Sequence, residues 1–296
     1  MFLIKKLSTY LSIALIPDKE IRQIAKELWK HKYRLCGVAQ TAIRKKIAFN
    51  SNNYTTVALG SSHCEACFNP AFFSSPSFNF GINSCDNFMM YEIYKNIIKK
   101  SDIKNVIVFY DVFSRGNDNT KRKDFNYLFL PLKYILGFEY KQEDKNIEQL
   151  CLKNEKKIAG KTDKKYNGYN PIQDGTDYNL LEERCKNHLK LFNRGDEDYL
   201  LLKLAKECKE DGKNFILVFS PAQRVYKDKM PDSDTLFNNI TSKIAAITGL
   251  GREYNLYNTE IFEKDEYWLD MDHMNEKGAE VFTKHLSSLL KEDNLI

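Results

Sequence analysis

Two short segments near opposite ends of the sequence carry the residue types of a nucleophile and its general base. Gly60-Ser61-Ser62 follows a short apolar run, and Asp270 stands three residues before His273. A serine at a strand-to-helix turn exposes its hydroxyl and has backbone N–H groups nearby, which suits a nucleophile and an oxyanion donor. An aspartate at this spacing can hold the Nδ1–H of a histidine, so that Nε2 takes a proton from serine.

Each segment taken by itself also has an ordinary structural interpretation. Gly-Ser-Ser is a common turn, a lone His273 is more often a capping or surface histidine, and Asp270 can be a charge at a helix entrance. The catalytic interpretation therefore requires a fold that brings the two segments together.

Apolar runs along the chain predict such a fold, because they indicate the strands of a buried parallel sheet. Strands are expected at 55–59, 77–80, 105–110, 214–219 and 253–257, and helices at 86–100 and 276–291. Alternating strands and helices predict a sheet covered on both faces. We expect a flavodoxin-like three-layer α/β/α sandwich with a central parallel sheet, in which ligands bind beyond the carboxyl ends of the strands.

Two parts of the chain fall outside this alternation. Residues 1–50 predict a basic amphipathic helical arm, and residues 51–296 predict the α/β domain, with an insertion at about 112–195. The insertion is rich in Lys, Asn, Asp and Gly, and so long a loop in a compact domain is usually functional or disordered. We expect it to lie over the ligand end of the sheet, as a lid containing a helix near 124–136.

Together the motifs resemble those of the SGNH (GDSL-type) hydrolase superfamily. Gly60-Ser61-Ser62 is similar to the first block, with Ser62 in the nucleophile position and Ser61 where the family usually has Asp. Gly81 lies where the second block supplies a backbone N–H to the oxyanion, beside the N–H of Ser62. Asp270 and His273 match the last block well. The resemblance implies a catalytic triad of Ser62, His273 and Asp270.

The third block departs from the family pattern. The family has Gly-x-Asn-Asp directly after a strand, and its Asn side chain donates into the oxyanion hole, whereas the nearest Asn here is Asn117, several residues late. Asn117 folding back, Asn83 or another donor would substitute, or the third donor is absent. Loss of one such donor costs about 10²–10³ in rate, so a degenerate or slow site is an open alternative. The resemblance covers about residues 54–111 and 213–291.

This resemblance leads to two hypotheses of function. In the first, the protein is a serine esterase or O-acyltransferase acting on an acylated glycan, similar to bacterial polysaccharide esterases and O-acyltransferases that build or modify surface polysaccharides. Its acyl-enzyme would be resolved by water or by a sugar hydroxyl. In the alternative, the protein keeps the SGNH fold with a degenerate site and binds or assembles glycans.

Other residues bear on ligands and cofactors. Gln223 and Arg224 follow an expected strand and are candidates for substrate binding, although a helix start with surface charge also explains them. Cys64-x-x-Cys67 beside His63 would suit zinc or thiol chemistry, but no second Cys/His cluster has matching spacing, so we expect no metal. We expect no cofactor either, except an acyl donor such as acetyl-CoA if the protein is a transferase.

The charge distribution bears on partners and location. The net charge of +5 over 296 residues is too small to indicate a nucleic-acid partner. Residues 1–50 hold 11 of the 45 Lys and Arg and 3 of the 40 Asp and Glu, a local net charge of +8. An apolar stripe beside these cations can lie on an anionic membrane surface, or it can pack on its own domain.

Targeting signals and cysteines bear on the cellular location of the protein. No apolar run approaches the ~20 residues that span a bilayer, and the N-terminus has no small-x-small cleavage site. Seven cysteines without a framework favour a reducing compartment. We expect a cytoplasmic protein, peripheral on the inner membrane through residues 1–48, whose partner is a glycan or glycolipid.

Overall fold

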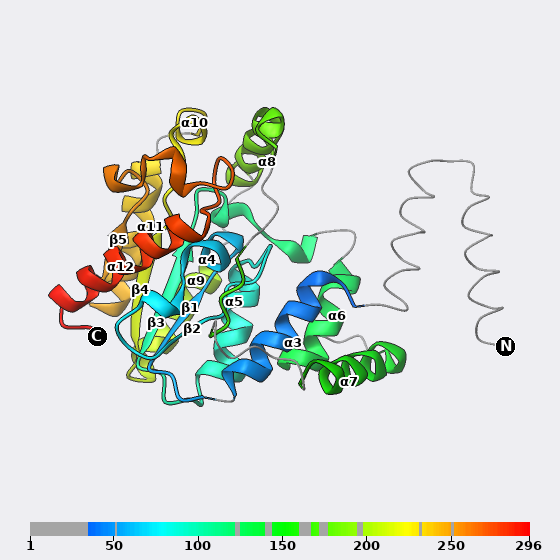
Figure 1. The fold of residues 1–296 in the computed structure, drawn as a ribbon. Coiled ribbons are helices and arrows are strands. Elements are labelled where there is room, and N and C mark those ends of the chain that lie inside the picture. Colours follow the sequence, from blue (N-terminus) through cyan, green and yellow to red (C-terminus); the bar gives the residue numbers. More distant parts are fainter. Residues whose placement is uncertain are drawn as a thin grey trace, which may run out of the picture.

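A computed structural model gives the fold of the α/β body and of part of the arm (Figure 1). The residues that the structure describes are 35–50, 52–121, 125–139, 144–159, 167–171, 177–193, 198–230, 233–249 and 252–296. The membrane-facing prediction for residues 1–34 lies outside them. Among the described helices, none combines the length and apolar character needed to cross a bilayer.

Five parallel strands form the central sheet, in the order β2-β1-β3-β4-β5. Their bounds are β1 Thr56–Leu59, β2 Ser77–Asn79, β3 Asn105–Tyr110, β4 Asn214–Phe219 and β5 Glu253–Asn255. Each neighbouring pair runs parallel, and this strand order is the flavodoxin-like one. The predicted fold class and all five predicted strands are therefore confirmed.

Helices cover both faces of the sheet, as the strand sequences require. Every residue of β1, β2 and β3 is buried, which is typical of parallel strands enclosed by helices. On one face, Ile107, Phe109 and Val218 pack with the apolar side of α12. On the other face, residues such as Val106 and Leu217 pack with α5, α9 and α11.

The body contributes six α-helices to the described part of the chain, and the two that the sequence predicted, at 86–100 and 276–291, correspond to α5 with its π-helical continuation and to α12. Their bounds are α4 Ser62–Cys67, α5 Asn87–Ile93, α9 Tyr199–Glu210, α10 Arg224–Lys227, α11 Ser233–Thr248 and α12 Glu276–Glu292. A π-helical turn, Tyr94–Ile98, continues α5. Short 3₁₀ turns lie at Pro70–Phe72, Ser114–Gly116, Asn119–Lys121, Tyr178–Leu180, Glu260–Phe262 and Asp265–Tyr267.

The insertion contains more helix than the sequence indicates. Besides α6 (Phe125–Leu136), it forms α7 (Lys145–Ala159) and α8 (Leu181–Phe192), which the sequence analysis assigned to a long polar loop. That interpretation is wrong for α7 and α8, which are helices and not loop. Their sequences did not indicate a helix because each helix buries only a narrow stripe of side chains, centred on Cys151 in α7 and Cys185 in α8. Such helices look polar in composition and are stabilised by tertiary packing rather than by propensity.

The insertion divides between two places in the fold. In Figure 1, α6 and α7 lie against α3 (Gly37–Phe49), the described part of the arm, at one side of the molecule. The buried side chains of α3, including Ala39, Ala42 and Ile43, belong to the main core. Helix α8 lies instead with α10 beyond one end of the sheet, where its His188 contacts Tyr226 of α10.

The turn after β1 has no room for a side chain at Gly60. A Cβ there would lie 2.7 Å from Cβ of Cys64 and 2.7 Å from Cβ of Phe109. We expect Gly60→Ala to lower the free energy of unfolding by about 1–3 kcal/mol, the usual cost of overpacking, measured by chemical denaturation. Gly37→Ala is the matched control, since nothing lies within 4 Å of its Cβ position. An equal loss in both variants would contradict the explanation.

Candidate active site

The carboxyl ends of the parallel strands gather the predicted site residues. Ser62 begins α4 directly after β1, and Asp111 follows β3. His273 lies on the segment between β5 and α12. This segment is fixed by an antiparallel bridge between Trp268 and Met274, and Nε1 of Trp268 donates to the carbonyl of Phe262.

Ser62, His273 and Asp270 form a hydrogen-bonded chain. Nε2 of His273 lies 2.9 Å from Oγ of Ser62, and Nδ1 lies 2.9 Å from Oδ2 and 3.1 Å from Oδ1 of Asp270. Because a carboxylate faces Nδ1, the proton of a neutral ring resides there, and Nε2 accepts from the Ser62 hydroxyl. The sequence grouped these three residues through motif resemblance and the expected convergence of strand ends, and the fold places them in the order that acyl transfer needs.

Asp270 is itself held rigidly by the backbone. Its Oδ1 accepts hydrogen bonds from the N–H groups of Asp272 and His273, at 3.0 and 2.7 Å. The side chain is fully buried. A carboxylate fixed in this way sets the orientation of the His273 ring and its tautomer.

Ser61, the neighbour of the candidate nucleophile, has a different role. It is the N-cap of α4, since its Oγ accepts from the N–H of His63. The same hydroxyl donates to Oδ2 of Asp111 at 3.0 Å. Ser61 is therefore engaged in the turn, which leaves Ser62 as the serine that faces the imidazole.

The oxyanion prediction is only partly matched by the structure. The N–H of Ser62, at the first position of α4, has no acceptor four residues back, and no hydrogen bond from it occurs among the described residues. The N–H of Gly81, in contrast, donates to Oδ1 of Asn79 at 2.8 Å. The side chain of Asn79 therefore occupies the N–H of Gly81 in this conformation, and the assignment of Gly81 as an oxyanion donor stays a prediction.

Among the described residues, neither asparagine suggested as a substitute donor makes a hydrogen bond to Ser62. The N–H of Asn83 donates to Oε2 of Glu65, and its Oδ1 accepts from Ser84. Asn117 lines a small hollow with Asp86. Of the two predicted backbone donors, the N–H of Ser62 has no acceptor among the described residues, whereas that of Gly81 has one.

Gln223 and Arg224 differ in their position relative to the site. The N–H of Gln223 donates to the carbonyl of Met271, two residues before His273. Its side-chain oxygen accepts from the hydroxyl of Tyr178, and its amide donates to Asp265. Gln223 therefore fastens the insertion beside the site. Arg224 is exposed and lines an open hollow of about 360 Å³ with Lys227 and Tyr257.

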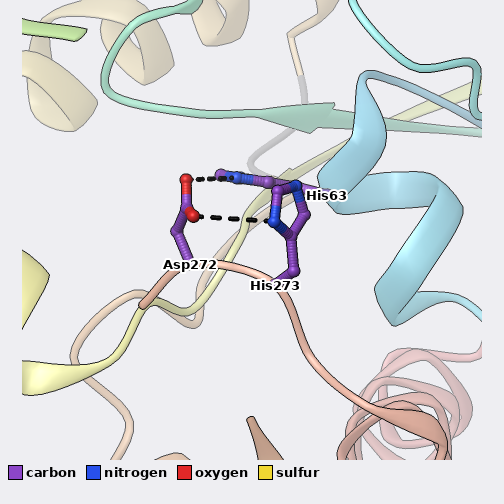
Figure 2. Close-up of side chains that lie close together, drawn as sticks. All are labelled: His63, Asp272 and His273. Carbon is purple, nitrogen blue, oxygen red and sulfur yellow. Dashed lines mark hydrogen bonds and ion pairs between the residues drawn. The ribbon is translucent and has the colours of Figure 1, made fainter. Parts of the chain in front are cut away.

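Beneath the triad lies a second chain of charged groups that the sequence analysis missed. Nδ1 of His63 is 2.7 Å from Oδ1 of Asp111, and Nε2 is 3.1 Å from Oδ2 of Asp272. Nε of Arg184, from α8, donates to both oxygens of Asp272 at 2.8 and 3.0 Å. Figure 2 shows His63, from α4, joined through Asp272 to His273. The signals available were the position of Asp111 after β3 and the adjacency of His63 to Ser62.

Burial and charge act in opposite directions on this chain. Burial alone would lower the pKa of His63, but the charge of Asp111 and the hydrogen bonds that the ring donates to the carboxylates of Asp111 and Asp272 raise it to about 10. Burial would raise the pKa of Asp272, yet its contacts with His63, His273 and Arg184 hold it well below the usual range. His63 is therefore a cation and Asp272 an anion at neutral pH.

Ligand atoms of His63, Asp272 and His273 lie within 4.8 Å of one another, close enough to share a cation. The donor set does not suit one, because His63 holds a proton on the nitrogen that faces Asp272, and both oxygens of Asp272 accept from Arg184. A metal ion would have to displace that proton and a guanidinium together. The cluster is better described as a buried ion network.

Comparison with known proteins adds no family to this description. No family model matches the sequence, and a search of curated proteins finds no significant similarity. The functional interpretation therefore depends on the fold and on the geometry of the site.

Proposed function

We propose that the protein is a serine esterase or O-acyltransferase. The observation that carries the proposal is the chain from Ser62 Oγ through His273 to Asp270, with contacts of 2.9 Å on each side of the imidazole. A hydroxyl, an oriented neutral imidazole and a buried carboxylate in this order constitute the machinery of nucleophilic acyl transfer. The parallel sheet provides the rigid frame that such a site requires.

The reaction proceeds in two stages on these residues. Ser62 Oγ attacks the ester carbonyl while His273 Nε2 takes the hydroxyl proton, and the N–H of Ser62 hydrogen-bonds to the resulting oxyanion. The C–O bond of the ester then breaks, and His273 returns the proton to the leaving alkoxide. In the second stage water or a sugar hydroxyl gives its proton to His273 and attacks the acyl carbon. The bond between that carbon and Ser62 Oγ then breaks, and His273 returns the proton to Oγ, which releases the acid or the acylated sugar.

The substrate that we propose is an acylated glycan or glycolipid of a bacterial surface polysaccharide, handled by a cytoplasmic or membrane-peripheral protein. Support comes from the basic first fifty residues and from the polar insertion, whose Tyr178 stands 47% exposed beside Gln223. An aromatic ring with an anchored hydroxyl at the rim of a site suits a sugar face. No cofactor is required for hydrolysis, whereas transfer would use an acyl donor such as acetyl-CoA.

A second candidate function is glycan binding or assembly without turnover. It is favoured by one observation, namely that Asn79 occupies the N–H of Gly81 and so leaves a single predicted oxyanion donor in place. Because each lost donor costs about 10²–10³ in rate, such a site could bind an acylated sugar and release it unchanged.

Covalent labelling separates the two candidates. A fluorophosphonate probe is expected to label the wild-type protein at Ser62, located by peptide mass spectrometry, and to leave Ser62→Ala unlabelled. Ser61→Ala is the matched control and should still be labelled, since its hydroxyl is bonded to Asp111 rather than to the base. An unlabelled wild-type protein that still binds acylated oligosaccharides would support the second candidate instead.

A further inference from the structure

The candidate base His273 lies between two buried carboxylates rather than one. Nδ1 is 2.9 Å from Oδ2 of Asp270 and 3.6 Å from Oδ1 of Asp272, and both acids are fully buried. Each nearby anion favours the imidazolium form of a histidine. Two uncompensated carboxylates would therefore hold His273 protonated, and an imidazolium cannot take the proton of Ser62.

The second chain of charges removes this difficulty. Asp272 makes an ion pair with His63 on one side and with Arg184 on the other, while Asp111 balances the remaining charge of His63. Two anions and two cations thus cancel within the chain. Asp270 is left as the carboxylate whose charge His273 experiences in full.

We propose that Arg184 and His63 are positioning residues that neutralise Asp272 and thereby keep His273 able to accept a proton. The inference rests on the proposed function, since it concerns the base of that reaction. Arg184 belongs to α8, so the insertion supplies a charge that the site in the α/β body requires. The insertion is then part of the catalytic unit and more than a cover over it.

The further histidine and tyrosine side chains that interact with Asp270 or Asp272 do not supply this compensation. They come from α8, α10, the 3₁₀ turn at 178–180 and the segment after β5, and they are His188, Tyr226, Tyr178 and Tyr257. Burial lowers the pKa of His188 to about 4, so its ring is neutral and accepts the hydroxyl of Tyr226. Burial raises the pKa of each tyrosine, so all three are uncharged at neutral pH.

Arg184 is the accessible member of the chain and is the one to change. Its side chain is 22% exposed, whereas His63, Asp111 and Asp272 are almost entirely enclosed. Arg184→Gln removes the charge, and Arg184→Lys retains it. Lys186→Gln makes the same change of charge at an exposed position on the same helix and is the matched control.

The primary measurement is the pH dependence of kcat/KM for p-nitrophenyl acetate. In Arg184→Gln, we expect the acid limb of the profile to move to higher pH by about one unit, because the anion of Asp272 then favours protonated His273. Arg184→Lys and Lys186→Gln should keep the wild-type limb. A profile of Arg184→Gln that falls in height without moving would show a merely structural role and overturn the proposal.

A double variant tests the electrostatic cause. Replacing Asp272 by Asn in the Arg184→Gln background removes the anion that Arg184 compensates, so the acid limb should return toward its wild-type position. If the double variant keeps the displaced limb, the displacement does not arise from Asp272 and the proposal is wrong.

A second measurement, the titration of His273 by NMR, needs no ester turnover. Failure of the charge-balance proposal can therefore be distinguished from failure of the proposed function. The chain has five histidines, and the ring signals of ¹⁵N-histidine-labelled protein can be followed by NMR, with His273→Gln identifying the signal of His273. We expect that ring to titrate at higher pH in Arg184→Gln than in the wild type. An unchanged titration contradicts the charge balance, whereas absence of ester turnover in the wild type contradicts the proposed function.

Discussion

Ester turnover is expected to fall by about 10⁴-fold or more in both Ser62→Ala and His273→Ala, because groups that act as one nucleophilic unit lose nearly the whole effect when any member is removed. In the proposed mechanism Ser62 provides the attacking oxygen and His273, whose Nε2 lies 2.9 Å from Ser62 Oγ, takes its proton. The measurement is kcat/KM with p-nitrophenyl acetate, beside circular dichroism to confirm that each variant is folded.

The same experiment contains its own test of coupling. The double variant Ser62→Ala/His273→Ala should be no slower than either single variant, since the residual rate comes from binding and oxyanion contacts. Ser84→Ala, which changes an exposed serine bonded to Asn83, and His285→Gln, whose ring contacts Phe262, are the matched controls and should retain wild-type rates. A single variant at Ser62 or His273 that keeps a tenth of the activity would exclude this triad.

The sequence predicted the sheet well because its signals are local. The apolar runs that form β3 and β4 are bounded within the chain itself, and a strand enclosed on both faces reads as a continuous apolar run. The pairing of Ser62 with His273 across 211 positions is not local. It was reached through motif resemblance and through the rule that the carboxyl ends of parallel strands converge.

The occupied N–H of Gly81 could not be read from the sequence. The side chain of Asn79 donates and accepts at the same time. Its amide nitrogen donates to the carbonyls of Cys64 and Phe68, and its oxygen accepts from the N–H of Gly81. Which of several acceptors an N–H meets depends on side-chain positions fixed by packing around β2. Motif spacing places a glycine near the site but does not determine the partner of its N–H.

The charge network was missed for a related reason. Arg184 reaches Asp272 from a helix that the sequence pattern did not reveal, and no role was predicted for Asp272. An ion pair between residues far apart in the sequence produces no periodic pattern, so the sequence around either residue does not indicate it. What could have been noticed is that Asp111 is a carboxylate placed directly after a strand that ends at the site.

Replacing Asp111 by alanine is expected to lower the free energy of unfolding by about 3–5 kcal/mol, the usual cost of breaking a buried ion pair from one side. Asp111 accepts from both His63 and Ser61 and is almost entirely buried, so the variant leaves the His63 cation enclosed with one partner fewer. Asp118→Ala on the same loop is the control. Its pair with Lys121 lies at the surface and should contribute less than about 1 kcal/mol.

The pH dependence of the unfolding free energy lost in Asp111→Ala shows how much of that loss comes from the charge of His63. The pKa of His63 is raised to about 10 in the folded protein from an ordinary value of 6.5, so its stabilising contribution is complete below about pH 6.5 and is lost as pH rises through about 10. Urea denaturation at pH 7 and pH 10 should therefore show a larger cost of Asp111→Ala at pH 7.

Asp111→Asn separates charge from shape in this measurement. It keeps the size of the side chain and an acceptor oxygen but removes the anion that contributes most to raising the pKa of His63. We expect the unfolding free energy of Asp111→Asn to fall less than that of the wild type between pH 7 and pH 10, whereas Asp118→Ala follows the wild-type curve. Parallel curves for wild type and Asp111→Asn would mean that His63 is not held as a cation by Asp111, and the neutralisation of Asp272 would then depend on Arg184 alone.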